Sequence, residues 1–184
     1  MSTLSTAAWA AHNLGISASL GGLLFGKAAL NPSLSVIDSK PERGKILNAA
    51  WNRYNAVNIV SFGTAAATWF VGRAGLSGGE IDEESRNLVL AKDVLFVAAA
   101  LTGLASTIRG YQLSRQAPGG ATPIESGTTP ADDTPEAAAR LLRTVNVLGN
   151  VNIVLVGAIG VITTILSMKA AESTRWSAVS RFLP

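Results

Sequence analysis

Four long segments of this chain contain no charged residue, and this feature constrains the fold more than any other. Each segment is close to the length of helix, about 15–25 residues, that crosses the roughly 30 Å hydrocarbon core of a bilayer. A helix of a soluble bundle would instead carry charges along its outer face. The charge-free segments cover residues 1–26, 54–72, 94–108 and 144–168. We therefore expect four transmembrane helices, at 7–25, 57–71, 88–108 and 145–168.

Composition supports membrane insertion and excludes several kinds of site. Charged residues make up 15% of the chain, below the roughly 25% of soluble domains, and the mean hydropathy is +0.32. The net charge of +3 is spread out, without the basic cluster and interleaved aromatic residues of a nucleic-acid site. With no cysteine and one histidine, disulfides, thiolate ligands and a histidine-rich metal site are excluded. We therefore expect no nucleic-acid partner, no metal and no cofactor.

The distribution of basic residues predicts the orientation. Four crossings place both termini and the middle connection on one side with six Lys and Arg residues, and the first and third connections on the other side with nine. Basic residues favour the cytoplasmic side. We therefore expect a multi-pass protein of a bacterial cell (inner) membrane, with connections one and three in the cytoplasm and both termini outside. Nothing before Lys27 is basic, so the first segment lacks the basic start of a cleaved signal peptide and is expected to be retained.

The second half of the chain resembles the first. After a shift of 94 residues, nine of the 32 positions from 41 to 72 are identical, including Pro41-Glu42 with Pro135-Glu136. A shift of 81 aligns segment 7–25 with the start of 88–108. Because the matched Pro, Glu and Asn residues are not apolar filler, we favour a duplicated helical hairpin over a likeness of composition. The repeats cover about 7–73 and 88–168, with a twofold axis along the membrane normal.

The remaining segments complete a single membrane domain, 1–184. The Pro/Gly/Thr-rich stretch 116–133 is typical of a flexible linker. The C-terminal stretch 172–184 has the spacing of an interfacial amphipathic helix, and a frayed polar tail is the alternative. Each Pro-Glu pair is typical of a helix start, with proline in the first turn and an acid near the positive end of the dipole. Asn31-Pro32 is expected to end the first helix, since proline disfavours helical conformation before it.

Small residues at four-residue spacing predict close helix packing. Such stripes let backbones approach where lipid and protein are equally apolar, and we favour packing within the chain over a dimer face. The stripes consist of Ala18, Gly22 and Gly26 on the first helix, Gly63 and Ala67 on the second, and Gly103 and Thr107 on the third.

Polar side chains near the cytoplasmic ends of the second and fourth helices are the first candidate site. Polar residues inside a membrane are costly, and they commonly mark function. Under the duplication Asn52 pairs with Asn146, and Asn58 with Asn152. Two interpretations stay open, namely interhelical hydrogen bonds and a polar pocket for a small ligand or headgroup. The ligand-binding candidates are Asn52, Arg53, Asn55, Asn58, Asn146, Asn150 and Asn152.

A second candidate lies near the outer ends of the first and third helices. His12 and Asn13 are expected to approach Lys92 and Asp93, and the duplication places His12 and Asp93 at equivalent positions. A His–carboxylate pair can transfer protons near neutral pH. A buried or interfacial ion pair is the alternative, and no nucleophile occurs at a recognisable spacing. His12 and Asp93 are therefore catalytic candidates only under the hypothesis of a membrane enzyme, which we favour least, and no metal site is expected.

One resemblance to known proteins lies in the first 60 residues. The run 21–26, Gly-Gly-Leu-Leu-Phe-Gly, continues to Asn31-Pro32, and a basic connection and Arg53-Tyr54 follow. This order is similar to that in small four-helix bacterial membrane proteins of the anthrone-oxygenase-like and related uncharacterised groups. The resemblance implies a four-helix membrane fold more than it implies an activity.

Taken together, the sequence favours a non-enzymatic role. The first hypothesis is a structural or accessory subunit of a membrane complex, or a binder of a small lipid-like ligand. The alternatives are a small oligomeric transporter or channel, and a membrane enzyme that acts on an apolar substrate through the His/Asp pair. The expected partners are the lipid bilayer, together with other membrane subunits or further copies of the chain.

Overall fold

The described part of the chain folds into four long helices. The structure is a computed structural model that describes the backbone of residues 3–74 and 83–180. The model is 86% helix, and no strand occurs in the described residues, which confirms the all-α prediction. The long helices are α1 (Thr3–Phe25), α3 (Lys40–Ala74), α4 (Glu83–Ser114) and α5 (Glu136–Ser180).

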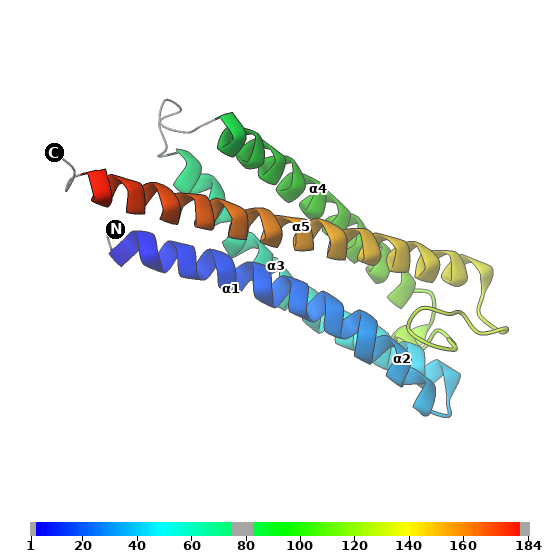
Figure 1. Cartoon of the computed structure of the whole chain (residues 1–184). Helices are drawn as coiled ribbons and strands as arrows, with labels where there is room; N and C mark the ends of the chain where they lie inside the picture. Colours follow the sequence, from blue (N-terminus) through cyan, green and yellow to red (C-terminus); the bar gives the residue numbers. More distant parts are fainter. Residues whose placement is uncertain (1–2, 75–82, 181–184) are drawn as a thin grey trace.

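The helices associate as two antiparallel hairpins (Figure 1). α1 packs along α3, and α4 packs along α5, while α1 also contacts α5 and α3 contacts α4. The α1–α3 and α4–α5 connections lie at the same end of the molecule, and α1 starts and α5 ends at the opposite end. Two hairpins related by a twofold axis would pair in this way, and the duplication itself stays a prediction.

The first helix does not end at Asn31-Pro32, so that expectation was wrong. α1 passes into the π-helix η1 (Gly26–Leu30), then into α2 (Asn31–Ser33) and the 3₁₀ turn η2 (Leu34–Val36). The Asn31 N–H donates to the carbonyl of Gly26, five residues back. A π-turn of this kind shifts the hydrogen-bond register, and the missing N–H of Pro32 is accommodated directly after it.

Glycines on α1 let α3 approach closely. A Cβ atom on Gly15 would lie 2.4 Å from the carbonyl oxygen of Ser61, and one on Gly26 would lie 2.4 Å from the Trp51 ring. The space that a Cβ on Gly22 would need is likewise occupied by the ring of Tyr54. The predicted stripe is therefore right at Gly22 and Gly26. Ala18 is exposed, however, so Gly15 is the third contact.

The second and third predicted stripes lie in different surroundings. Gly63 and Ala67 on α3 are exposed, and a Cβ on Gly63 would have no neighbour within 4 Å. Gly103 on α4 faces the side-chain amide of Asn152 on α5, at 3.3 Å from its Nδ2 to a built Cβ. Only the Gly103 position therefore lies at a close contact between helices.

The connection between α4 and α5, residues 115–135, is packed rather than extended, and we call it the cap. It includes the expected flexible linker 116–133, but Ile124 is buried in a small core with Leu34 and Leu142. Backbone hydrogen bonds tie it to the first hairpin, from Gly127 N–H to the Asn31 carbonyl (3.0 Å) and from Ile124 N–H to the Lys40 carbonyl (3.3 Å).

The predicted helix boundaries agree with the structure at both Pro-Glu pairs. α3 begins at Lys40 and α5 at Glu136. α5 continues without interruption through Ser180, so residues 172–180 of the expected separate C-terminal helix belong to α5. Residues 181–184 lie outside the described residues.

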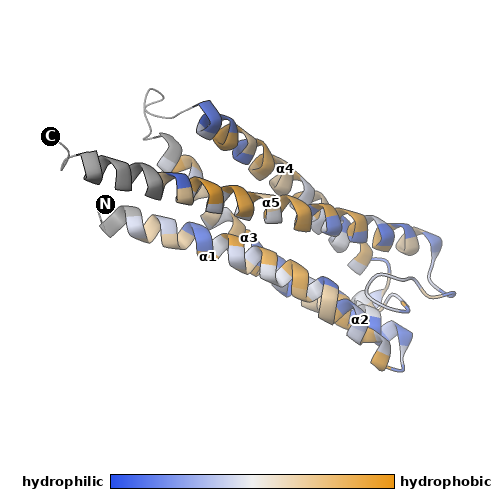
Figure 2. Cartoon of the chain, in the orientation of Figure 1, coloured by the Kyte–Doolittle hydropathy of each residue, from blue (hydrophilic) through white to orange (hydrophobic). Residues whose placement is uncertain are grey.

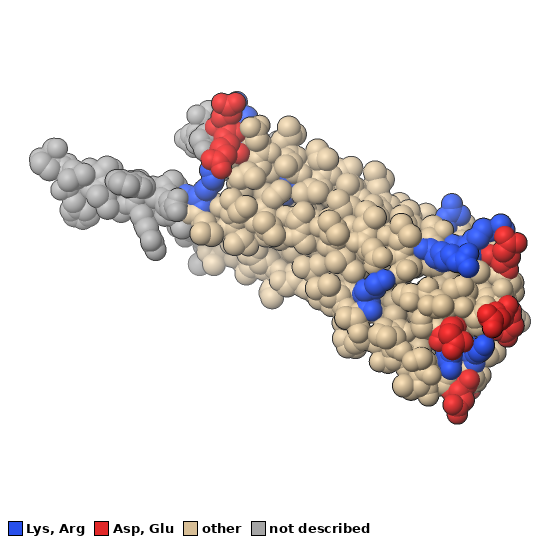
Figure 3. All heavy atoms as spheres, turned by 45° about the vertical axis from the view of Figure 1, so that its right-hand side comes forward, with Lys and Arg blue, Asp and Glu red and all other residues tan. Residues whose placement is uncertain are grey.

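The flanks of the molecule are apolar, and the charges lie toward its ends (Figures 2 and 3). Two helices, α4 and the part of α5 up to Ala170, are long and apolar enough to cross a membrane, and only 22% of the most apolar window of each is buried. Large apolar side chains are also exposed on α1 and α3. Across the four long helices, the exposed apolar side chains include Leu14, Phe25, Val60, Val71, Val94, Leu101, Val154 and Val161.

Candidate functional site: an amide-lined cavity beneath the cap

A cavity of about 80 Å³ lies between the two hairpins at the capped end. It is bounded by the end of α1 with η1, the first half of α3, the last part of α4 and the first half of α5, and Gly127 of the cap contributes to its wall. Apolar side chains such as Leu23 and Leu142 form part of the lining. The side-chain amides that line it belong to Asn31, Asn48, Asn52, Asn55, Asn58, Asn146, Asn150 and Asn152.

The structure brings together most of the predicted ligand-binding candidates. All six predicted asparagines line this one cavity, whereas Arg53 is exposed and is not part of its wall. Asn31 and Asn48 also line the cavity and were not among the predicted candidates. Asn48 is one helical turn before Asn52, so extending the polar face of α3 backward would have found it. That these residues bind a ligand stays a prediction.

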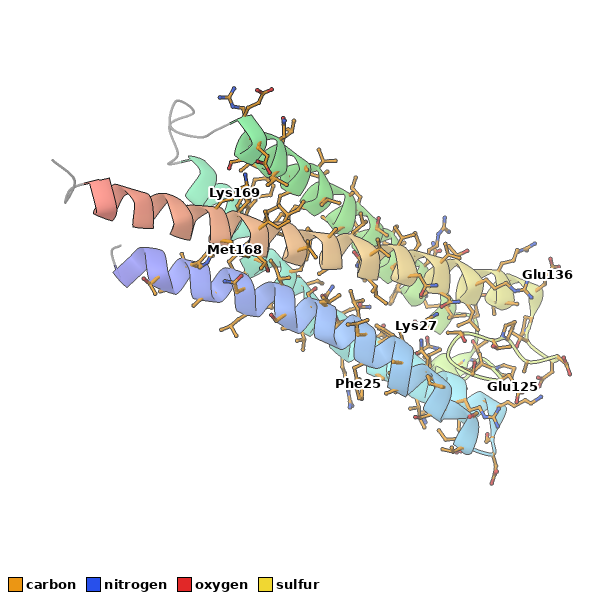
Figure 4. The ribbon with its side chains drawn as sticks, viewed as in Figure 1. Phe25, Lys27, Glu125, Glu136, Met168 and Lys169 are labelled. Atoms are coloured by element: carbon orange, nitrogen blue, oxygen red, sulfur yellow. The ribbon has the colours of Figure 1, made fainter. Side chains whose placement is uncertain are left out.

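Lys27 supplies a positive charge at the margin of the cavity. Its Nζ donates a hydrogen bond of 2.6 Å to Oδ1 of Asn146, which joins η1 to α5. Figure 4 shows Lys27 on the side of the first hairpin that faces α5. Of the described residues that line the cavity, Lys27 is the only charged one. No described carboxylate forms an ion pair with it, so the cavity carries a net positive charge.

Asn58 and Asn152, which the predicted duplication pairs, differ in their hydrogen bonds. Oδ1 of Asn58 accepts a hydrogen bond from the Ser19 hydroxyl, so Nδ2 is the atom that remains for another partner. Asn152 is 5% exposed, and its Oδ1 has no hydrogen-bond partner among the described residues. A buried acceptor without a partner costs about 1–3 kcal/mol. The cavity wall therefore contains one unsatisfied acceptor.

The cap is held in place by a buried arginine. Arg43 donates from Nε to the Ile37 carbonyl (2.6 Å) and from NH1 to the Glu125 carboxylate (3.1 Å), and Lys40 lies 3.4 Å from the same carboxylate. Hydrogen bonds from Arg43 and then Lys40 hold the pKa of Glu125 below its usual value. Asn48, which lines the cavity, donates to the carbonyl of Gly120 in the cap (2.8 Å).

The second candidate forms a buried cluster nearer the other end. Nδ1 of His12 lies 2.8 Å from the Ala65 carbonyl. Because a carbonyl oxygen only accepts, Nδ1 carries the proton of the neutral ring, and Nε2 accepts a hydrogen bond from the Lys92 ammonium at 2.9 Å. Lys92 is fully buried, 3.7 Å from the Trp69 ring centroid. The expected approach of His12 to Lys92 is confirmed. Asp93 accepts a hydrogen bond from Trp69 Nε1 (2.8 Å), so Trp69 links it to His12.

The structure and the comparisons with known proteins assign no chemistry to this cluster. Among the described residues, no three histidine or acidic side chains come together to hold a metal ion. No protein-family model, curated protein or solved structure matches the chain. The resemblance to anthrone-oxygenase-like proteins and the catalytic reading of His12 and Asp93 therefore stay predictions.

Proposed function

We propose that this chain is a non-enzymatic, four-helix membrane protein that binds a lipid-like ligand in the cavity between its two hairpins. The cavity, with its amide lining, Lys27 and the unsatisfied acceptor of Asn152, is the observation that carries the proposal. Asparagines that served only to join helices would be expected to satisfy one another. An unsatisfied buried acceptor is instead expected where a ligand supplies the donor.

Exposed apolar side chains support the membrane part of the proposal. A core helix of a soluble protein hides its apolar surface, but only 22% of the most apolar window of α4 and of α5 is buried. On α1 and α3, Leu14 is 70% exposed and Val71 is 75% exposed. Such a continuous apolar flank in water would be an aggregation hazard. We propose that all four long helices cross the bilayer, α1 and α3 with more small and weakly polar residues than the other two.

The position of the cavity suits an amphiphile. One basic side chain borders each charge-free segment at the capped end of the bundle. Together these side chains mark one edge of the apolar flank, and the cavity lies at that edge. An amphiphile bound there can place its polar head among the amides and its tail along the apolar flank. These basic side chains belong to Lys27, Arg53, Arg109 and Arg143. By the same distribution of charge, the capped end faces the cytoplasm.

Native mass spectrometry of the full chain, released from mild detergent, tests the binding. We expect one retained lipid-like molecule per chain, and its loss when Asn58 and Asn152 are both replaced by Leu. Replacement of the exposed Asn87 by Leu is the matched control and should leave the adduct in place. A chain that carries no amphiphile, but co-purifies with a second membrane protein, would overturn ligand binding in favour of the accessory-subunit hypothesis.

Cysteine labelling tests the crossings and their orientation, because the chain has no native cysteine. Asp132 in the cap and Asn87 near the start of α4 are both exposed. In intact cells an impermeant maleimide should label the Asn87→Cys variant and not the Asp132→Cys variant. Labelling of both variants from outside, or release of the chain by alkaline carbonate, would contradict the four crossings.

A further inference from the structure

We infer that the cavity selects a ligand whose polar head carries both a negatively charged oxygen and a hydroxyl hydrogen. This is the chemistry of a phosphoglycerol headgroup, and it is shared by a phosphatidylglycerol-type lipid and by free glycerol phosphate. The inference rests on the proposed function, since it names the chemical class that the same cavity takes. Two features of the wall carry it, the charge of Lys27 and the unsatisfied acceptor of Asn152.

The negative charge follows from Lys27. An ammonium group partly removed from water is costly unless a counter-charge compensates it. The neutral Oδ1 of Asn146 takes one of its three hydrogens, and no described acidic side chain lines the cavity. The remaining hydrogens suit a phosphate or carboxylate oxygen, which forms stronger, charge-assisted bonds with an ammonium. A head with a net positive charge would be repelled.

The hydroxyl follows from Asn152. Its Oδ1 can only accept, so a phosphate oxygen cannot satisfy it, and a ligand must bring an O–H or N–H to this atom. Asn152 is nearly fully buried, whereas Lys27 is half-buried at the margin. The head therefore enters with the donor group foremost and the anionic group behind it. A choline head has no such hydrogen and carries a positive charge, so it fails on both counts.

The size of the cavity is compatible with this head. One water molecule needs roughly 10–15 Å³ measured in this way, so a cavity of about 80 Å³ accepts a group of roughly five to eight heavy atoms. A glycerol unit has this size. Asn52 and Asn150 in the wall are exposed, and the opening there accommodates the phosphate and the start of the tail.

The experiment compares ligands that differ in one property at a time. The full chain is placed in nanodiscs that contain equal amounts of phosphatidylglycerol, phosphatidylethanol and phosphatidylcholine with identical acyl chains. Phosphatidylethanol has the same phosphodiester charge as phosphatidylglycerol and no hydroxyl in its head. Native mass spectrometry then measures which lipid the released chain retains. We expect about tenfold enrichment of phosphatidylglycerol over phosphatidylethanol and of phosphatidylethanol over phosphatidylcholine, the factor that about 1.4 kcal/mol provides for each property.

Variants assign the two contacts. Lys27→Gln should remove the preference for phosphatidylethanol over phosphatidylcholine and keep the preference for phosphatidylglycerol over phosphatidylethanol. Asn152→Leu should remove the preference for phosphatidylglycerol over phosphatidylethanol and keep the preference for charge. Arg53→Gln is the matched control, because it removes one positive charge at the same edge from a residue outside the cavity wall, and it should change neither ratio. The lipid pair tests the inference even if a variant fails to fold.

The outcomes separate the inference from the proposed function. Equal retention of all three lipids overturns the inference and leaves a lipid-binding cavity. Equal retention of phosphatidylethanol and phosphatidylglycerol overturns the role of the hydroxyl. Loss of lipid when free glycerol 3-phosphate is added at low concentration supports the head chemistry and contradicts a lipid ligand. Retention of no lipid and no glycerol phosphate by a folded chain overturns both.

Discussion

Replacement of Gly44 by Ala should release the cap from α3. A Cβ on Gly44 would lie 1.9 Å from the carbonyl oxygen of Thr122. Both groups belong to the backbone, so no side-chain rotation can relieve the contact. The two segments must separate by about 1.1 Å to restore even a 3.0 Å contact. Because the clash sits between a helix and a loop, we expect the loop to move.

The magnitude follows from the contacts that the separation weakens. The hydrogen bonds from Asn48 to Gly120 (2.8 Å) and from Ile124 to Lys40 (3.3 Å) span the same contact, and each contributes about 0.5–1.5 kcal/mol. Overpacking adds about 1–3 kcal/mol. Alanine in a helix recovers about 0.5–1 kcal/mol relative to glycine. These contributions span about 1–5.5 kcal/mol. Because the loop can move and relieve part of the overpacking, we expect a net loss toward the lower end, about 2 kcal/mol of cap stability, equivalent to roughly 30-fold more opening.

Labelling of a buried cysteine measures this opening. Thr122 is 1% exposed and its hydroxyl has no hydrogen-bond partner among the described residues, so Thr122→Cys is a mild change that provides the only thiol of the chain. Maleimide should react about 30 times faster in the Gly44→Ala background. Gly72→Ala, on the same helix and with no atom within 4 Å of the added Cβ, is the control. Equal labelling rates in the two backgrounds would refute the close contact.

Three further predictions concern the two polar sites and the cap. His12→Ala should lower the free energy of unfolding by about 2–4 kcal/mol, because it empties a packed site and leaves Lys92 without its acceptor. Unfolding is measured by tryptophan fluorescence in micelles. Lys92→Met in the same background should recover part of the loss, and an unchanged unfolding midpoint for His12→Ala would contradict the packing. Because Arg43 and Lys40 lower the pKa of folded Glu125 below 4.5, their contribution to cap closure is complete above pH 4.5 and is lost as the pH falls through the lowered pKa. The labelling rate at Thr122→Cys, divided at each pH by the rate of the exposed Asp132→Cys variant to remove the pH dependence of the thiolate, should therefore be constant from pH 8 to pH 5 and rise below that range. Glu125→Gln should remove this rise, and a rise of equal size in both would exclude Glu125 as its source. Asn152→Leu should raise the free energy of unfolding of the delipidated chain by about 1–2 kcal/mol, since it removes an unsatisfied buried acceptor, whereas a lower value would indicate that this oxygen already has a partner.

The expected asparagine site was predictable because local geometry determines it. Positions 52, 55 and 58 fall on one face of any helix, and the charge gaps indicated that the helix is continuous. Lys27 was harder to assign to the site, because its contact with Asn146 joins residues 119 positions apart. The π-turn at η1 also changes the direction of the side chains that follow it, and no pattern in the sequence predicted this turn.

The packing of the cap and the exact contacts of His12 could not be derived from the sequence. Pro, Gly and Thr are typical of linkers, but here Gly44 on α3 lies against the backbone of Thr122 in the cap. Gly120 and Gly127 of the cap lie against the side chains of Asn48 and Asn31, and such contacts depend on the partner segment. At the second site the duplication placed Asp93 opposite His12. Adjacent residues on a helix differ by about 100° in direction, and the packing of α4 turns Lys92 toward His12. Of the two α4 residues that were expected near His12, the one that contacts it is therefore Lys92.

The cap has a consequence for how the cavity fills. It covers one end of the bundle with a bonded loop, while Asn52 and Asn150, which line the cavity, are exposed on the flank formed by α3 and α5. In a bilayer, a ligand would then arrive sideways from one leaflet, and occupancy would follow the mole fraction of that lipid in the leaflet rather than any aqueous concentration. Exchange would be governed by two-dimensional diffusion, and the chain would report on the composition of the membrane around it.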